Sequence, residues 1–287
     1  MPSTQVCYND GLTGEVCFDP VTVNFSDTTP FTVTAKHLAD GQSPIAYYTV
    51  GRTAGSSPTV WTGGLIPSTN SGDNWQELTL VFCVYPVVHD DDKIFIFGSD
   101  QSQFTVATND SAGGLWLAAK DAGTNVIQTV TLTSGLAIDQ WHSVMISAVN
   151  YTPSTPMVFV EIWIDGVEVY SGNWDTLGPG FNPMDYNGPC YVGAGDYPFG
   201  SPDFWEGLNC YLAYVWCKEE YLDPNTYWDS FFDSNNRPKD VGADGSSVTG
   251  SPPDSYFPDA DFTNNRGTGP DWTEIGTVAS APSSPTD

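Results

Sequence analysis

The sequence predicts an all-β protein built as an antiparallel sandwich, and three observations support this prediction. The run 78–85 (LTLVFCVY) is almost entirely apolar, as in a strand that is buried on both faces. Two alternating runs, 157–164 and 167–170, meet at Asp165-Gly166, a pair that tolerates the positive φ of a tight hairpin turn. The chain also has 28 Gly, 22 Pro, 10 Trp, 14 Tyr and 15 Phe, which fits many short strands and not a disordered chain.

Strand-like runs occur along most of the chain. Before residue 57 the expected strands are 21–25, 31–36 and 45–50. From residue 60 the signals recur at regular spacing, as a sandwich requires. The expected strands there are 78–85, 93–98, 104–108, 115–119, 126–132, 141–148, 157–164, 167–170, 190–193 and 208–216.

One short helix is expected. Asp223 has the side chain of an N-cap and Pro224 suits the first turn, so residues 225–232 should form about two turns. Trp228, with Phe231 or Phe232, would dock this helix on the sandwich.

Three regions follow from these signals. Residues 1–57 form an N-terminal β segment that is a candidate attachment region, and residues 58–234 form the sandwich. Residues 235–287 alternate Gly, Pro, Ser and Asp with apolar anchors such as Phe257 and Trp272. The anchors favour an extended strap, packed on the sandwich or on neighbouring molecules, over a disordered tail.

The charge is strongly negative. Eight Lys and Arg stand against 35 Asp and Glu, a formal net charge of −27. Binding to a phosphate backbone or to an anionic membrane needs clustered basic residues, so we expect neither nucleic acid nor a membrane as a partner. The carboxylates either keep molecules apart by repulsion or hold Ca²⁺, which prefers oxygen ligands. The first ten residues lack the features of a secretory signal, and no apolar run has the length of a membrane span.

The six cysteines do not predict a metal site. None forms a CxxC pair, and three His are too few to complete a zinc site. Cys83, Cys190 and Cys210 lie in strand-like runs and are expected to be small buried hydrophobes. Cys7 and Cys17 flank a turn, NDGLTG, and are either buried hydrophobes or a local disulfide formed in an oxidising medium.

The order of motifs in the central region carries a resemblance. QWHSV (140–144) is followed by VEIWIDGVEVYSG (160–172), YVGAGDY (191–197) and FWEGLNCYLAYVWC (204–217). This order resembles the laminin-G-like, concanavalin-A-like jelly-roll superfamily, in which a Trp-His dipeptide opens a central strand and a VDG hairpin follows. The match covers about residues 60–232, and it implies an antiparallel jelly-roll β-sandwich.

The C-terminal run resembles a second pattern. Residues 239–250 (KDVGADGSSVTG) and 263–269 (TNNRGTG) are similar to the tail of laminin-G-like proteins encoded by tailed bacteriophages and prophages. The resemblance implies a virion protein that is made in the host cytoplasm and located on the virion surface. Its implied partners are the major capsid protein or tail proteins of the same virion, further copies of itself, and host surface polysaccharide.

Two sets of candidate site residues follow. The resemblance implies a rim Ca²⁺ held by loop carboxylates, for which Asp196 and Asp203 are suitably placed, and no other cofactor is expected. A second set consists of aromatic residues expected in loops, where they would contact either a glycan or a neighbouring protein. These residues are Trp174, Tyr186, Tyr197 and Phe199.

The sequence does not encode an obvious catalytic site. Glu161, Asp165 and Glu168 are the nearest approach to a glycosidase carboxylate pair, but Asp165 is needed for the hairpin turn and Glu168 lies beyond it. His142 has no GxSxG nucleophile to act on, so a structural role is expected for it. We therefore predict a protein that is not an enzyme.

Three functional hypotheses remain at this stage. The first is a non-enzymatic capsid decoration (cement) protein that displays a laminin-G-like jelly roll on the virion. The alternative is a tail fibre or receptor-binding lectin that engages host surface glycans. The second alternative is a jelly-roll glycan hydrolase.

Overall fold

The computed structural model contains two compact units, residues 1–44 and residues 45–287. The predicted three-part division, with boundaries after residues 57 and 234, stays a prediction. The residues that the structure describes are 6–9, 15–18, 48–50, 60–63, 77–87, 93–99, 102–108, 113–120, 126–132, 135–150, 157–175, 190–192, 210–258, 262–275 and 285. The expected strands 21–25 and 31–36 lie outside them.

The first unit contains a hairpin of β1 (Val6–Asn9) and β2 (Glu15–Phe18), and its register places Cys7 directly opposite Cys17. Opposed residues of antiparallel strands have Cα atoms about 4.5–5.5 Å apart, within the range that a disulfide spans. We expect oxidised protein to contain a Cys7–Cys17 bond, which peptide mapping without reductant detects. Recovery of both thiols unpaired after mild oxidation would contradict this prediction.

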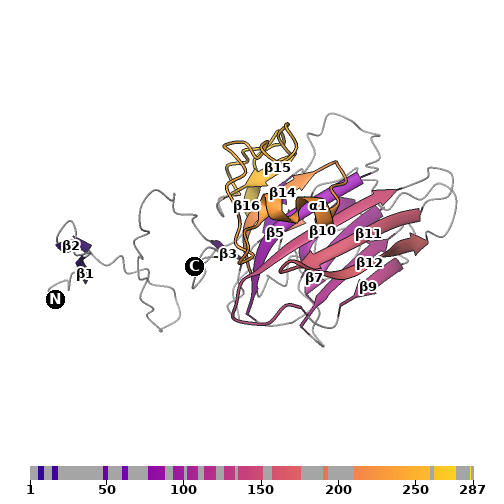
Figure 1. Ribbon diagram of the computed structural model, residues 1–287, viewed down its shortest axis with the longest axis horizontal. Helices are drawn as coiled ribbons and strands as arrows, with labels where there is room; N and C mark the ends of the chain where they lie inside the picture. Colours follow the sequence, from indigo (N-terminus) through magenta and orange to yellow (C-terminus); the bar gives the residue numbers. More distant parts are fainter. Residues whose placement is uncertain are drawn as a thin grey trace. The chain divides into compact units, whose positions relative to one another are not determined.

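The second unit is a sandwich of two seven-stranded antiparallel sheets (Figure 1). The first, called the β10 sheet, has the order β12-β11-β10-β5-β14-β15, with β3 also paired to β14. Its strands are β3 (Tyr48–Val50), β5 (Glu77–Pro86), β10 (His142–Asn150), β11 (Met157–Ile164), β12 (Val167–Asp175), β14 (Cys210–Lys218) and β15 (Ser255–Phe257). The predicted all-β antiparallel sandwich is therefore confirmed.

The second sheet, called the β7 sheet, has the order β16-β4-β13-β6-β7-β8-β9. Its strands are β4 (Val60–Gly63), β6 (Lys93–Ser99), β7 (Ser102–Thr108), β8 (Leu115–Lys120), β9 (Val126–Thr131), β13 (Cys190–Val192) and β16 (Thr273–Ile275). In the part of the chain that the structure describes, no helix has the length and apolarity to cross a membrane.

Strand β5 is buried on both faces, as its apolar run predicts. Alternate residues such as Leu80 and Phe82 face the β7 sheet and join the core between the two sheets. The intervening residues Val81 and Cys83 face outward, yet both are fully buried because a second apolar cluster covers them. The β10 sheet thus has a covered outer face as well as a covered inner face.

Helix α1 (Pro224–Phe231) supplies much of that cover, lying across β5 and β10 in Figure 1. The Asp223 carboxylate accepts a hydrogen bond from the Asn225 backbone N–H at 2.9 Å, which confirms the predicted N-cap. Trp228 and Phe231 pack into the outer cluster, where Phe231 contacts Trp216 with ring centroids 4.9 Å apart. The predicted docking of the helix is confirmed.

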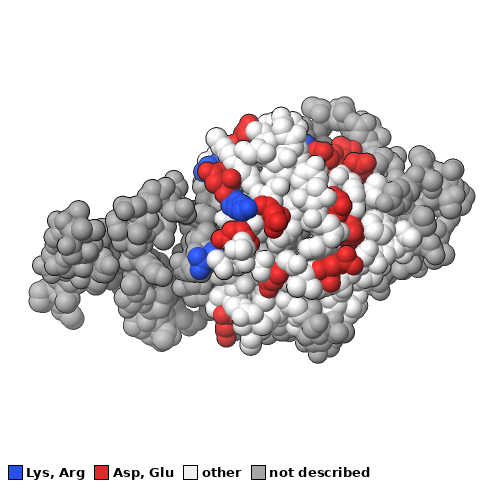
Figure 2. Space-filling view, viewed as in Figure 1, with Lys and Arg blue, Asp and Glu red and all other residues white. Residues whose placement is uncertain are grey.

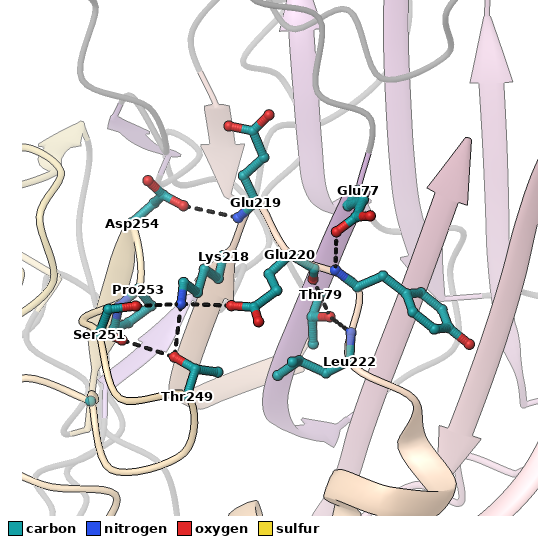
Figure 3. Close-up of polar contacts among 12 residues, drawn as sticks. Glu77, Thr79, Lys218, Glu219, Glu220, Leu222, Thr249, Ser251, Pro253 and Asp254 are labelled. Carbon is teal, nitrogen blue, oxygen red and sulfur yellow. Dashed lines mark hydrogen bonds and ion pairs between the residues drawn. The ribbon is translucent and has the colours of Figure 1, made fainter. Parts of the chain in front are cut away.

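The connection from β14 to α1 is fixed to the β10 sheet by polar side chains (Figure 3). The Thr79 hydroxyl donates to the Glu220 carbonyl at 2.7 Å and accepts from the Leu222 N–H at 2.9 Å. The Glu77 carboxylate accepts from the Tyr221 N–H at 3.0 Å. These bonds satisfy backbone groups that would otherwise be buried without partners, and they set where α1 begins.

The C-terminal strap adds one strand to each sheet. β15 pairs with β14 in the β10 sheet, and β16 pairs with β4 in the β7 sheet. The part of the strap before β15 is also bonded to β14: the Trp216 indole donates to the Gly245 carbonyl at 3.1 Å, and the Lys218 ammonium donates to the hydroxyls of Thr249 and Ser251 at 2.7 and 2.8 Å. The strap therefore joins both layers of the sandwich.

Candidate functional site

Three aromatic side chains from adjacent strands lie together on the outer face of the β10 sheet. Tyr85 is near the end of β5, Tyr211 is its register partner near the start of β14, and Trp141 immediately precedes β10. The ring centroids of Tyr85 and Trp141 are 5.6 Å apart, and those of Tyr85 and Tyr211 are 5.4 Å apart, both in edge-to-face contact. All three are half-buried. We call Tyr85, Trp141 and Tyr211 the aromatic row.

The loop before Trp141 is held rigidly beside the row. The Leu136 N–H donates to the Gly113 carbonyl at 2.8 Å, and the Asp139 N–H donates to the Pro86 carbonyl at 2.9 Å. Asp139 has a φ of 62°, a left-handed conformation that is uncommon for residues other than glycine. Its side chain is exposed, as is that of Ile138 (49%). The loop therefore presents one carboxylate and one apolar side chain from a fixed backbone.

The pKa values of the two phenols in the row are raised, in part by the Asp139 carboxylate. Burial raises the pKa of Tyr85, and the negative charge of Asp139 raises it further. Burial also raises the pKa of Tyr211, with smaller contributions from Tyr85 and then Asp139. Both phenols consequently remain protonated at neutral pH and can donate hydrogen bonds. The row and Asp139 together thus offer flat apolar faces, hydroxyl donors and a carboxylate acceptor, the groups that contact the C–H face and the hydroxyls of a sugar.

Of the residues that the sequence suggested for ligand contact, the structure describes Trp174 alone, and Trp174 does not belong to this site. Trp174 was expected in a loop, but it lies in β12. There it is only 2% exposed and belongs to the core between the sheets. The prediction that it forms a surface contact is wrong. Tyr186, Tyr197 and Phe199, and the predicted calcium ligands Asp196 and Asp203, lie outside the described residues. Within the described residues, no group of three or more His, Cys, Asp or Glu is arranged to hold a metal ion.

The three candidate carboxylates of the hairpin have different surroundings and do not form a pair. Glu161 is buried on the outer face of β11, and its carboxylate accepts a hydrogen bond from the Tyr221 hydroxyl. Glu168 is exposed on β12. Asp165 forms the turn between these strands, as predicted, and its carboxylate lies 2.6 Å from Nδ1 of His142. His142 is 3% exposed, consistent with the structural role expected for it.

Glu161 gives the fold a pH dependence. Burial raises the pKa of its carboxyl, the Tyr221 hydrogen bond opposes this, and the charges of Asp223 and Glu168 add to the rise. A carboxyl whose pKa is higher in the folded state stabilises the fold below its unfolded-state pKa, and this contribution is lost as the pH rises through the folded-state pKa. The ionised form is therefore the unfavourable one at neutral pH.

We expect the substitution Glu161→Gln to raise the melting temperature at neutral pH, because glutamine accepts the Tyr221 hydrogen bond without charge. The gain should shrink as the pH falls through the raised folded-state pKa, because the wild-type carboxyl then becomes protonated itself. Thermal unfolding from neutral to acidic pH measures the effect, with Glu219→Gln as the control, because Glu219 is exposed and is not among the charges that shift the Glu161 pKa. A lower melting temperature of Glu161→Gln at neutral pH would contradict the prediction.

Comparisons with known proteins agree with the fold. Comparison of the sequence with family models and with curated proteins gives no match. Among solved structures, the chain is similar to a putative carbohydrate binding protein from Bacteroides ovatus, with a TM-score of 0.54 and 14% identity over 89% of this chain and 67% of that chain. At this identity the similarity shows a shared fold.

Two further solved structures resemble the chain at lower scores. A heptameric SAP-like pentraxin from Limulus polyphemus matches with a TM-score of 0.46 and 13% identity, over 83% of this chain and 98% of that chain. Domains LG4-5 of the mouse laminin alpha1 chain match with a TM-score of 0.43 and 15% identity, over 74% of this chain and 48% of that chain.

Proposed function

We propose that this protein is a non-enzymatic glycan-binding protein and that the aromatic row is its binding surface. The observation that carries the proposal is the contact of three half-buried rings, from β5, β14 and the start of β10, beside the exposed carboxylate of Asp139. The rings offer apolar area at low conformational cost because they are already packed against one another. The Bacteroides ovatus protein, described as a putative carbohydrate binding protein, supports the proposal at the level of the fold.

The carboxylates that a glycosidase would use are engaged elsewhere, which supports binding without hydrolysis. Glu161 accepts from the Tyr221 hydroxyl, and Asp165 binds His142 and accepts from the Ser143 N–H at 2.9 Å. A glycosidase needs two carboxyl groups facing one scissile bond, one of them free to exchange a proton. Neither of these carboxylates is on the aromatic row.

The test is a glycan array followed by calorimetric titration of the glycans that bind. We expect Trp141→Ala to weaken binding about tenfold or more, because truncating a packed aromatic anchor removes most of its contact area. Trp116→Ala is the matched control, since Trp116 is also half-buried but lies on the outer face of the β7 sheet. Tyr211→Phe keeps the ring and removes one hydroxyl, so it should weaken binding less while leaving the packing intact.

Two results would overturn the proposal. One is equal weakening by Trp141→Ala and Trp116→Ala, which would indicate a general effect on folding. The other is binding that survives both Trp141→Ala and Tyr211→Phe. Far-ultraviolet circular dichroism and the melting temperature of each variant separate a loss of ligand contact from a loss of structure.

We further propose that the protein is displayed on a virion, where it either decorates the capsid or forms part of a tail appendage. The support is the resemblance of residues 239–250 and 263–269 to tails of phage-encoded proteins, together with the net charge of −27, which keeps neighbouring particles apart. Copy number per purified particle tests the proposal. Hundreds of copies favour decoration, a handful favours the tail, and absence from particles overturns display.

A further inference from the structure

The segments that form the aromatic row and the loop beside it are poor in positive charge. No Lys or Arg occurs in segments 77–87, 135–150 and 210–217, which supply the rings and the loop beside them. Figure 2 shows Asp and Glu spread over the visible face of the molecule, whereas Lys and Arg are few and lie mostly toward one side. An anionic ligand would therefore meet repulsion at this site and find no basic side chain from these segments to pair with.

The same geometry favours a cation. The faces of Trp and Tyr rings attract ammonium groups, and the row brings three such rings together, with Tyr85 in edge-to-face contact with each of the other two. Asp139 adds a full negative charge next to them, on a backbone that two hydrogen bonds hold in place at the loop, from Leu136 to Gly113 and from Asp139 to Pro86. A ligand whose ammonium group reaches Asp139 while its carbon skeleton covers the rings would use both features at once.

Taking the glycan-binding function as given, we propose that the site selects glycans with free amino groups, which are positively charged amino sugars, over N-acetylated or anionic glycans. The hydroxyls and the C–H face of the sugar meet the aromatic row, and the ammonium group pairs with Asp139. Cation–π attraction and a partly exposed ion pair each contribute modestly, so the expected preference over the N-acetylated form is about tenfold.

The test uses two chito-oligosaccharides of equal length, one fully N-acetylated and one fully deacetylated, at a pH that keeps the amine charged. The two differ only at the sugar nitrogen, which carries an acetyl group in one and a free, positively charged amine in the other. Calorimetric titration of the full-length wild-type protein should give about tenfold tighter binding of the deacetylated sugar at low salt. The ratio of the two affinities should fall as salt is added, because the ion pair is partly exposed.

The variants Asp139→Asn and Asp139→Gly test whether the negative charge of Asp139 causes the preference for the deacetylated sugar. Asparagine keeps the shape of the side chain and tolerates positive φ, and glycine adopts a φ of 62° without strain, so both variants should fold. Each should bring the two affinities close together. Glu168→Gln is the matched control, because it removes one exposed carboxylate from the outer face of the same sheet, away from the row. It should leave the preference in place.

The possible failures are distinguishable. Equal binding of both sugars by the wild type, with Trp141→Ala still weakening both, overturns charge selection and leaves the glycan-binding function standing. A preference that Glu168→Gln reduces as much as Asp139→Asn reflects the overall charge of the protein, and this also overturns selection at Asp139. If neither sugar binds and no glycan on the array binds, both proposals fall together.

Discussion

Substitution of Gly267 by alanine is expected to destabilise the protein by about 3 kcal/mol, because the added methyl group would collide with backbone atoms. A Cβ at this position would lie 2.5 Å from the Pro253 carbonyl oxygen and 2.9 Å from that of Asp254. Backbone carbonyls cannot rotate away as the end of a flexible side chain can. The turn that contains Gly267 would have to move away from Pro253 and Asp254, which lead into β15.

Gly250→Ala is the matched control for this prediction. Gly250 is also in the strap and has a φ of +82°, but a Cβ there would meet nothing within 4 Å. Its substitution therefore costs only the left-handed conformation, about 1 kcal/mol. Urea unfolding of both variants gives the comparison. Equal losses of unfolding free energy in the two variants would show that the collision of the added methyl group with the backbone costs nothing, and would contradict the prediction.

Asn265 explains why the strap depends on this close approach. Its amide oxygen accepts from the N–H groups of Tyr256 and Gly267 at 2.8 and 2.9 Å, and its amide nitrogen donates to the carbonyls of Asp254 and Gly269 at 3.0 and 2.8 Å. One side chain thus ties β15 to the turn that follows it. The NNRGTG run, which carries the resemblance to phage proteins, is therefore a folding element of the strap.

The features predicted correctly from the sequence are those that local chemistry decides. The apolar run of β5 leaves no polar face, so burial on both sides follows directly. Asp165-Gly166 requires positive φ at both residues, and the structure has φ of 50° and 77° there. Asp223 before Pro224 defines the start of α1 whatever the surroundings. None of these predictions depends on which strand lies beside which.

The features missed depend on pairing between distant segments. The aromatic row exists because β5 and β14 pair with Tyr85 opposite Tyr211, a contact between residues far apart in the chain. Taken singly, aromatic residues near strand ends do not indicate such a cluster. A prediction of the register between β5 and β14 would have been needed to find it. The strands β15 and β16 were missed for the same reason, because each has three residues and forms only against β14 or β4.

Trp174 was misplaced because its neighbours resemble a turn. Gly172 and Asn173 are poor strand formers, so the sequence suggested that the strand ends before them. Pairing with β11 nevertheless continues to Asp175. Tertiary packing therefore overrides local propensity at this strand.

Substitution of Asp165 by alanine is expected to cost about 3–4 kcal/mol, because it removes the acceptor for a buried histidine and a backbone N–H together. The Asp165 carboxylate lies 2.6 Å from His142 Nδ1 and accepts from the Ser143 N–H at 2.9 Å, and the Asn236 amide donates to the Asp165 carbonyl at 2.9 Å. Alanine would also adopt the φ of 50° less readily than aspartate. This arrangement is the physical basis of the Trp-His and Asp-Gly motifs occurring together in one sequence.

Asp165→Asn separates the two contributions. Asparagine tolerates the turn conformation and keeps an oxygen for the Ser143 N–H, but it lacks the charge that faces His142. Its loss should be smaller than that of Asp165→Ala by about 1–2 kcal/mol. A double-mutant cycle of Asp165→Asn with His142→Gln, measured by urea unfolding, isolates the pair. A coupling energy near zero would mean that Asp165 acts through the turn alone, and the Trp-His motif would then need another explanation.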